Sequence, residues 1–169
     1  SLNAAVTGGG AIFNDGGRMT ITNSLFVANS GYRAGVADGG ALYSGRLGTV
    51  VTNSIFYKNN ATDRGGAIAT SDNAAEVRNS ILWGNTANNT QNQISDFPGA
   101  GNTTLLYSDI QGGWNGNGTN NIDVDPQFVD AVNGNLHLQS NSQCIDAGSN
   151  ALVPPGIIAD LDGNPRFVD

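Results

Sequence analysis

Two groups of aspartates near the C-terminal end have the residue types and spacing of calcium ligands. Asp123 and Asp125 are separated by a single residue. Asp160, Asp162 and Asn164 have the Asp-x-Asp-x-Asn spacing with which a calcium-binding loop begins. The glutamate that closes an EF-hand loop does not follow, and Asp-Gly-Asn also forms ordinary turns. Turn formation is therefore the default interpretation, and Ca²⁺ is the one cofactor that we keep as a candidate.

The residue pattern argues against catalysis by a nucleophile or by paired carboxylates. His137, Cys144 and Asp146 are the types needed for a Cys-His-Asp arrangement. However, His137 alternates with two leucines, which is typical of an exposed strand position, and Cys144 resembles a small buried filler. Glycoside hydrolysis needs clustered carboxylates, and the sequence has no Asp-Asp pair and no Asn-Thr-Asp motif.

Composition and charge exclude several classes of protein. Only 12% of the 169 residues are charged, and Lys58 and Glu76 are the single lysine and glutamate, which argues against helical bundles. A net charge of −7 without a Lys/Arg cluster makes nucleic acid a poor partner. No apolar run reaches the roughly 18 residues of a membrane span. Cys144 is the single cysteine, so an internal disulfide is excluded.

Two short motifs recur in phase through the first two thirds of the chain. Gly-Gly-Ala followed by Ile or Leu occurs at 9–12, 39–42 and 65–68. An Asn-Ser motif that ends in Asn occurs at 23–29, 53–59 and 79–85, with a decayed copy at 107–113. The copies are 26 to 30 residues apart. This spacing indicates a repeat protein.

The repeat predicts stacked coils. Alternating stretches such as 19–23 and 49–53 are typical of strands, and Gly and Asn break them. A unit of this length with two or three short strands buries its apolar side only when neighbours stack on it, about 4.8 Å per layer. We therefore expect an all-β fold, a right-handed parallel β-helix (β-solenoid) of about four coils.

Equivalent positions in successive coils should form rows along the solenoid. One inward row would be Ile21, Val51, Val77 and Leu105, and a second would be Phe26, Phe56, Leu82 and Ile110. Asn29, Asn59 and Asn85 occupy equivalent bends, where we expect a structural ladder of side-chain amides.

A third row is the candidate ligand-binding site. If Phe26 points inward, Val27, Tyr57 and Trp83 point outward and the row becomes more aromatic along the solenoid. Trp114 lies in the Gly/Asn-rich segment 114–121, which we expect to be a loop, and it would extend the row. Exposed aromatic rows stack on the apolar faces of sugar rings, and apolar patches of this sort mark contacts in general.

Two other interpretations of the aromatic row remain open. The C-terminal tail would cover the row and make it a second core, which is the interpretation we favour. A change of phase by one residue would instead turn Leu25, Ile55 and Ile81 inward.

The motif pair resembles the repeats of chlamydial polymorphic outer-membrane proteins and, more broadly, bacterial surface β-helix proteins of the pectate-lyase-like superfamily. Segments 125–130, 136–138, 142–148 and 160–166 are similar to the closing segment of secreted bacterial β-helix repeat proteins. The resemblance implies an extracellular or cell-surface protein. The family includes lyases, adhesins and passengers without an assigned role, so it implies the fold more firmly than the activity.

The resemblance also implies one catalytic alternative. Lyases of this fold use a basic residue to abstract the proton α to a uronate, while Ca²⁺ neutralises the carboxylate. Lys58 and Arg64 are the candidates here. Lys58 occupies a bend position held by Ala28 and Gly84 in the sister coils, so a solvated lysine is the default. Asp38 and Arg64 both precede a Gly-Gly-Ala motif, so we expect them to pair between adjacent coils.

We expect one domain in which residues 1–113 form the coils and residues 114–169 form a tail. The tail contains a hairpin around Asn133-Gly134 and either covers one face of the solenoid or caps its end. The expected role is a non-catalytic module for adhesion or display, which binds a polysaccharide or a host or cell-surface ligand. Its open first coil predicts a fragment of a longer protein, capable of end-to-end self-association. The alternatives are the C-terminal part of a Ca²⁺-dependent polysaccharide lyase and a structural spacer of a surface layer.

Overall fold

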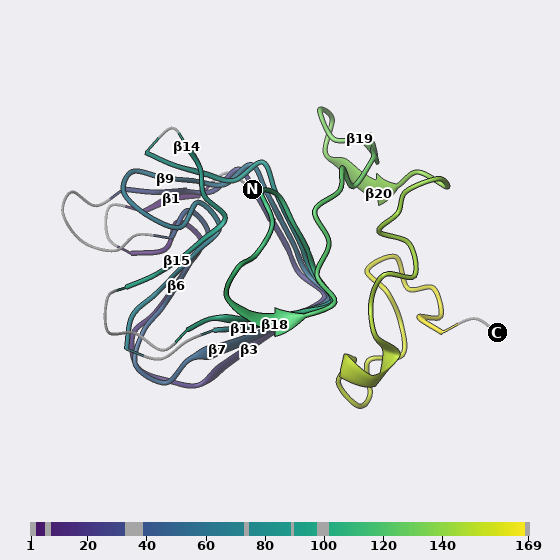
Figure 1. The fold of residues 1–169 in the computed structure, drawn as a ribbon, viewed down its shortest axis with the longest axis horizontal. Coiled ribbons are helices and arrows are strands. Elements are labelled where there is room, and N and C mark those ends of the chain that lie inside the picture. The colour runs from purple at the N-terminus through teal and green to yellow at the C-terminus, as the bar shows by residue number, and fades with distance from the viewer. Residues whose placement is uncertain are drawn as a thin grey trace.

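Each repeat passes through four short strands before the chain returns to the same position one layer further along. The computed structural model describes residues 3–5, 8–32, 39–72, 75–88, 90–97 and 102–167. Figure 1 shows strands of equivalent position lying one behind another around a common interior. The result is an all-β parallel solenoid of three complete turns with partial turns on both sides, as the repeats predict.

Within the described residues four sheets run along the solenoid, and each complete coil contributes one strand to each sheet. Their strands pair in parallel, except for the edge strand Thr90–Gln91, which is antiparallel to its neighbour. The first coil contains β2 (Ile12–Asn14), β3 (Met19–Thr22), β4 (Leu25–Val27) and β5 (Ser30–Gly31). The second contains β6 (Leu42–Ser44), β7 (Thr49–Thr52), β8 (Ile55–Tyr57) and β9 (Asn60–Ala61). The third contains β10 (Ile68–Thr70), β11 (Glu76–Arg78), β12 (Ile81–Trp83) and β13 (Thr86–Ala87). Partial turns add β1 (Ala4–Ala5), β14 (Thr90–Gln91), β15 (Ile94–Asp96), β16 (Thr104–Leu106), β17 (Asp109–Ile110) and β18 (Asn117–Thr119).

The number of strands in a coil is four rather than the expected two or three. The extra strands follow the two motifs directly: the Gly-Gly-Ala motif leads into a strand such as β6, and the Asn bend leads into a two-residue strand such as β9. Neither glycine of the motif leaves room for a Cβ atom, which on Gly39 would lie 1.8 Å from the carbonyl oxygen of Leu42 in the same coil. A Cβ atom on Gly40 would lie 1.9 Å from the carbonyl oxygen of Gly66 in the next coil.

Both predicted inward rows are confirmed. Strand pairing aligns the members of each row in register from coil to coil. All eight side chains are buried: Ile21, Val51, Val77, Leu105, Phe26, Phe56, Leu82 and Ile110. The rings of Phe26 and Phe56 stack with centroids 4.6 Å apart, so the aromatic core also repeats at the spacing of the coils.

The predicted asparagine ladder is also confirmed. Asn59 Oδ1 accepts hydrogen bonds from the backbone N–H and the side-chain amide of Asn29, at 2.9 and 2.8 Å. Asn85 Oδ1 accepts the equivalent pair from Asn59. The Asn59 amide also donates to the carbonyl oxygen of Phe26 at 2.9 Å. Each bend is therefore bound to its neighbour inside the protein, where water does not compete.

The composition of the Gly/Asn-rich segment 114–121 predicted a loop. The structure instead shows a strand within this segment. Residues 117–119 form β18, which pairs in parallel with β16. Gly118 permits this pairing because a Cβ atom there would lie 1.7 Å from the carbonyl oxygen of Leu105. Trp114 packs, partly buried, against the core, and its indole N–H donates to the carbonyl oxygen of Asn117 at 2.9 Å. This segment closes the core beyond the last coil.

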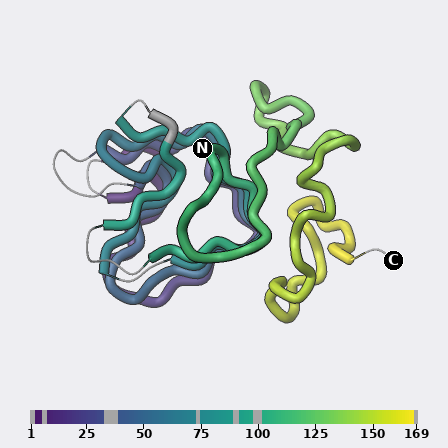
Figure 2. Tube along the Cα trace, in the orientation of Figure 1, coloured from purple at the N-terminus to yellow at the C-terminus, as the bar shows by residue number. Residues whose placement is uncertain are grey.

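Residues 124–167, which we call the strap, lie along the outer face of the sheet β4-β8-β12-β17 (Figures 1 and 2). The strap contains the predicted hairpin, formed by β19 (Phe128–Asp130) and β20 (Asn135–Leu138), and a 3₁₀ turn at Asn150–Leu152. The strap thus covers one face of the solenoid, while the preceding segment closes the end. The described part of the chain has no helix with the length and apolar character needed to span a membrane.

Candidate functional site: an aromatic cleft beneath the strap

The outward aromatic row has the predicted phase. Strand pairing places Val27, Tyr57 and Trp83 in register along β4, β8 and β12. Because Phe26 and its equivalents are buried inside, both neighbours of each face outward. The alternative phase, in which Leu25, Ile55 and Ile81 would fill the interior, is therefore wrong. Leu25 is 49% exposed.

The strap covers part of this row. Tyr57 is buried because Phe128 of β19 packs edge-on against its ring, with centroids 5.4 Å apart. The Lys58 ammonium lies 5.1 Å from the centre of the same ring. Trp83, one coil further along, is half-buried. The covering tail that we favoured from the sequence is thus confirmed at Tyr57, whereas Trp83 retains access to solvent.

Tyr57 and Trp83 line a cleft of about 460 Å³ between the solenoid and the strap. The strap contributes a third aromatic wall and a set of polar side chains, namely Phe128, Asp125, Gln127, Gln139 and Asn141. Trp114 is not among the residues that line this cleft, since it packs on the core. The cleft therefore combines aromatic surfaces with amide and carboxylate groups from a distant part of the sequence.

Gln127 lines the cleft, and its backbone is fixed by hydrogen bonds within the strap. Its backbone adopts a left-handed φ of 52°, and its N–H donates to Asp125 Oδ1 at 2.9 Å. Its carbonyl oxygen accepts from the Gln139 N–H at 2.9 Å. The side-chain oxygen of Gln127 is buried and, in the described ranges, has no hydrogen-bond partner. A buried acceptor without a partner is unfavourable.

The two basic candidates for lyase chemistry lie in different bends. Lys58 has a φ of 51°, equivalent to Ala28 and Gly84 at 52° and 68°, and its side chain rests on Tyr57. Arg64 lies 3.6 Å from Asp63, with its guanidinium 4.8 Å from the ring centre of Phe97. Neither residue lines the aromatic cleft. The expected partner of Arg64, Asp38, lies outside the described residues.

The aspartates considered as calcium ligands accept hydrogen bonds from nearby backbone. Asp123 accepts from the Gly112 N–H and Asp125 from the Gln127 N–H. Asp160 Oδ1 accepts the N–H groups of Asn164 and Asp162, and these bonds, with that from Asn164 foremost, lower the pKa of Asp160. Among the described residues no three His, Cys, Asp or Glu side chains are grouped to hold a metal ion.

The Cys-His-Asp arrangement is not assembled. His137 Nε2 lies 2.7 Å from Asp162 Oδ2, whereas the Cys144 thiol donates to Asp109 Oδ2 at 3.4 Å. Burial, together with the nearby Asp109 charge, raises the pKa of Cys144 to about 12, so this thiol stays protonated. The two side chains thus have separate partners.

Asp109 is a buried carboxyl group that belongs to none of the candidate sites expected from the sequence. It occupies the outward position of β17 that Ile81 holds in β12, and the strap buries it to 3% exposure. Its carboxyl accepts the Val124 N–H at 3.1 Å as well as the Cys144 thiol. Burial raises its pKa to about 6. Its sequence signal was the replacement of Leu25, Ile55 and Ile81 by aspartate in the decayed fourth copy.

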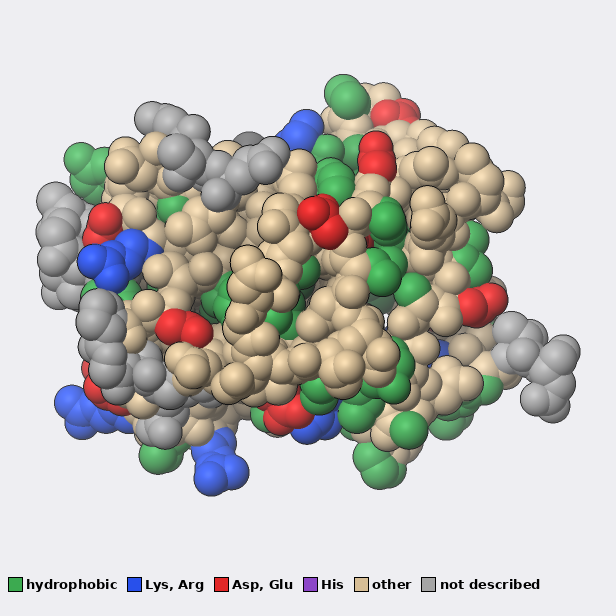
Figure 3. Space-filling model, in the orientation of Figure 1, with side chains coloured by type: hydrophobic (Ala, Val, Ile, Leu, Met, Phe, Trp, Pro, Cys, Tyr) green, Lys and Arg blue, Asp and Glu red, His purple; other side chains and the backbone are tan. Residues whose placement is uncertain are grey.

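Charge is sparse over the surface. On the face shown in Figure 3, acidic and basic side chains of the described residues are scattered among neutral ones, without a continuous basic patch. The fold and the cleft define the class: a parallel β-solenoid whose C-terminal strap encloses an aromatic, amide-lined cleft. No protein-family model, curated protein or solved structure matches the chain.

Proposed function

We propose that this chain is a non-catalytic glycan-binding module of an extracellular or cell-surface protein. The observation that carries the proposal is the cleft between Tyr57, Trp83 and Phe128, with amide and carboxylate groups along its strap side. Sugar rings present apolar C–H faces to aromatic rings and hydroxyl groups to polar side chains. The cleft offers both kinds of surface within one ligand-sized volume.

The charges favour a neutral glycan over a polyuronate. Asp125 lines the cleft, and the chain has a net charge of −7, so a polyanion would be repelled. The unpartnered oxygen of Gln127 calls for a donor, which a sugar hydroxyl supplies. The extracellular setting rests on the resemblance of the repeats to bacterial surface β-helix proteins, where adhesins occur.

A tryptophan-based titration tests this proposal directly. The chain has two tryptophans, so Trp114→Phe leaves Trp83 as the sole indole reporter. We expect neutral oligosaccharides, such as β-1,4-linked glucan, mannan, xylan and chitin fragments, to include at least one that shifts the Trp83 fluorescence saturably. Titration calorimetry should then show that Trp83→Ala weakens binding about tenfold or more, because a central aromatic contact is lost.

Phe13→Ala is the matched control for loss of an aromatic side chain. Phe13 is 49% exposed and stacks on Tyr43 in a different sheet, so its removal should leave glycan affinity unchanged. Absence of saturable binding across the neutral panel would refute the glycan proposal and favour the structural-spacer alternative.

The lyase alternative has its own readout. Polyuronates incubated with the chain, with and without Ca²⁺, should give no rise in ultraviolet absorbance from unsaturated ends. A calcium-dependent rise that disappears in Lys58→Ala would establish a lyase and overturn the non-catalytic proposal.

A further inference from the structure

Three asparagines occupy the same bend position in consecutive coils, at the edge of the sheet beneath the strap. Asn23, Asn53 and Asn79 have left-handed φ values of 49°, 52° and 47° in consecutive coils. The backbone N–H of each donates to the next coil, as in the bond from Asn53 to the carbonyl oxygen of Arg78. Their side chains differ in what they bind, although the repeat gives them the same position.

The first and third of these amides anchor the strap. Asn79 exchanges two hydrogen bonds with the backbone of Ser149, at 2.9 and 2.8 Å. Asn23 donates to the carbonyl oxygen of Ala159 at 3.1 Å and accepts from Arg166 Nη2 at 2.7 Å. The middle amide is the exception, because Asn53 Nδ2 is buried and has no hydrogen-bond partner within the part of the chain that the structure describes.

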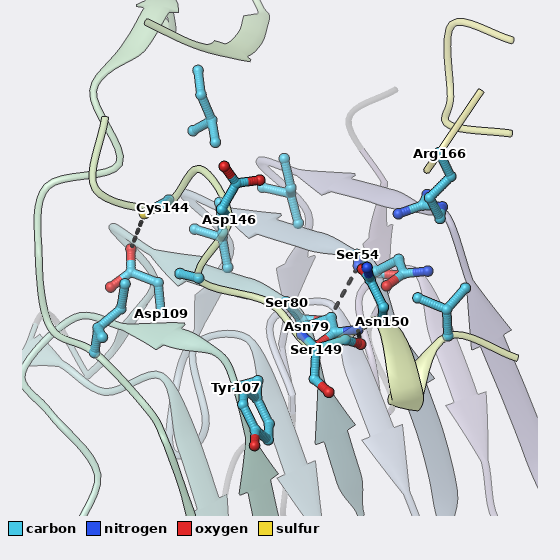
Figure 4. A pocket seen from close by; sticks show the side chains of 18 residues that line it. Ser54, Asn79, Ser80, Tyr107, Asp109, Cys144, Asp146, Ser149, Asn150 and Arg166 are labelled. Carbon is cyan, nitrogen blue, oxygen red and sulfur yellow. Dashed lines mark hydrogen bonds between the residues drawn. The ribbon is translucent and has the colours of Figure 1, made fainter. Parts of the chain in front are cut away.

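The strap leaves two adjoining hollows beside Asn53. Their volumes are about 300 and 660 Å³, and both are lined by Asn53, Ile55, Leu138 and Arg166. Figure 4 shows the smaller hollow, with Cys144 and Asp109 on one side and Arg166 approaching from the opposite side. These volumes fall within the range of about 300–1,000 Å³ that is typical of small-molecule sites.

A second donor at the junction of the hollows also lacks a partner. Arg166 Nε is buried and has no hydrogen-bond partner among the described residues, although its Nη2 group is bound to Asn23. Buried donors without acceptors are rare in folded proteins because each is unfavourable. Two of them around one junction, one belonging to a cation whose charge already interacts with the Asp160 carboxylate, indicate that an oxygen acceptor is missing there.

The remaining lining of the larger hollow combines an apolar groove with polar side chains, among them two carboxylates that are already engaged. Leu25 and Leu161 are 49% and 55% exposed and line it together with Ile55. Asp162 is paired with His137 at 2.7 Å, and Asp160 accepts backbone N–H groups. An occupant would therefore place its oxygen acceptors against Asn53 and Arg166 and its apolar part against the leucines.

We propose that the junction of Asn53 and Arg166 binds a small organic carboxylate whose apolar chain or ring lies in the groove of Leu25, Ile55 and Leu161. This site is separate from the aromatic cleft, since the two share no lining residue. Asn53 Nδ2 and Arg166 Nε each donate to the carboxylate. The ligand then completes the row of strap contacts that Asn23 and Asn79 begin.

Titration calorimetry with octanoate tests the site, with octanol as the probe that lacks the carboxylate. We expect saturable octanoate binding and at least about tenfold weaker binding of octanol, since two donors to a charged acceptor are lost. Asn53→Asp should weaken octanoate binding about tenfold or more, because it replaces a hydrogen-bond donor with a carboxylate that repels the ligand. Arg166→Gln should do the same, and its amide keeps a donor for Asn23.

Two further variants keep the test decisive. Arg18→Gln makes the same charge change at an exposed position outside both hollows and should leave octanoate binding unchanged. Leu161→Ala removes an exposed apolar contact of the groove and leaves the strap hydrogen bonds of Asn23 and Asn79 in place. It should weaken octanoate binding severalfold. The proposal fails if octanoate shows no saturable binding, if octanol binds as tightly, or if Arg18→Gln has the effect of Arg166→Gln.

Discussion

Replacing Asn59 with alanine is expected to lower the free energy of unfolding by about 4 kcal/mol, because four hydrogen bonds lose their side-chain partner together. The Asn59 side chain is fully buried and accepts twice from Asn29. It donates to Asn85 and to the carbonyl oxygen of Phe26. No water reaches these groups to replace the amide, so the loss spreads over three coils. Urea unfolding followed by circular dichroism measures the change.

Asn60→Ala is the matched control, one residue further along the chain. Asn60 is half-buried, and its side-chain oxygen accepts from the Thr86 hydroxyl at 2.9 Å. Its loss should lower the free energy of unfolding by no more than about 1 kcal/mol. Equal losses in the two variants would show that the ladder contributes no more than a surface hydrogen bond.

The second large effect is expected at Asp109, as a loss of stability when the pH rises from about 4 to 6. Burial raises the pKa of this carboxyl from 3.8 to about 6, so the folded chain holds a proton that the unfolded chain releases. The stabilisation is complete below the unfolded value and is lost as the pH passes the folded value. A shift of this size corresponds to about 3 kcal/mol.

Asp109→Asn should remove this part of the pH dependence. The amide oxygen still accepts from the Val124 N–H, and the amide of the variant can face the Cys144 sulfur. Unfolding free energies of the variant and the wild type, measured from pH 4 to 8, should diverge as the pH rises from about 4 to 6 and differ by a constant amount above pH 6, with the variant more stable. The exposed Asp15→Asn serves as control. If the Asp109 and Asp15 variants have the same pH profile, the carboxyl does not titrate between folded and unfolded chains as expected.

The sequence predicts the interior of the solenoid well because the repeat aligns equivalent positions. Phe26 and Phe56 occur at the same place in the Asn-Ser motif, and one strand register then places both inside. The strand at 117–119 was not predicted because its sequence has no alternation of apolar and polar side chains. Its Asn-Gly-Thr composition resembles a loop, although Gly118 is required by the closeness of the neighbouring strand.

Only the solenoid side of the aromatic cleft could be predicted from the sequence. Tyr57 and Trp83 belong to the repeat, so their outward row could be predicted. Gln127 and the other strap residues of the cleft have no periodic pattern that aligns them with a coil. Their placement depends on contacts such as that between Asn23 and Ala159, 136 residues apart in the sequence. The same holds for the hollow at Asn53.

The strap has a consequence for how such a chain can change length during evolution. Duplication or deletion of one repeat would leave the solenoid intact, because every coil offers its neighbours the same glycines, asparagines and apolar rows. The strap, however, contacts four consecutive coils through Asn23, Tyr57, Asn79 and Asp109. Removing one coil would displace its later contacts by about 4.8 Å. The strap therefore fixes the number of coils that it can span. Proteins that evolve from this chain by gaining or losing a coil within that span must alter the strap as well.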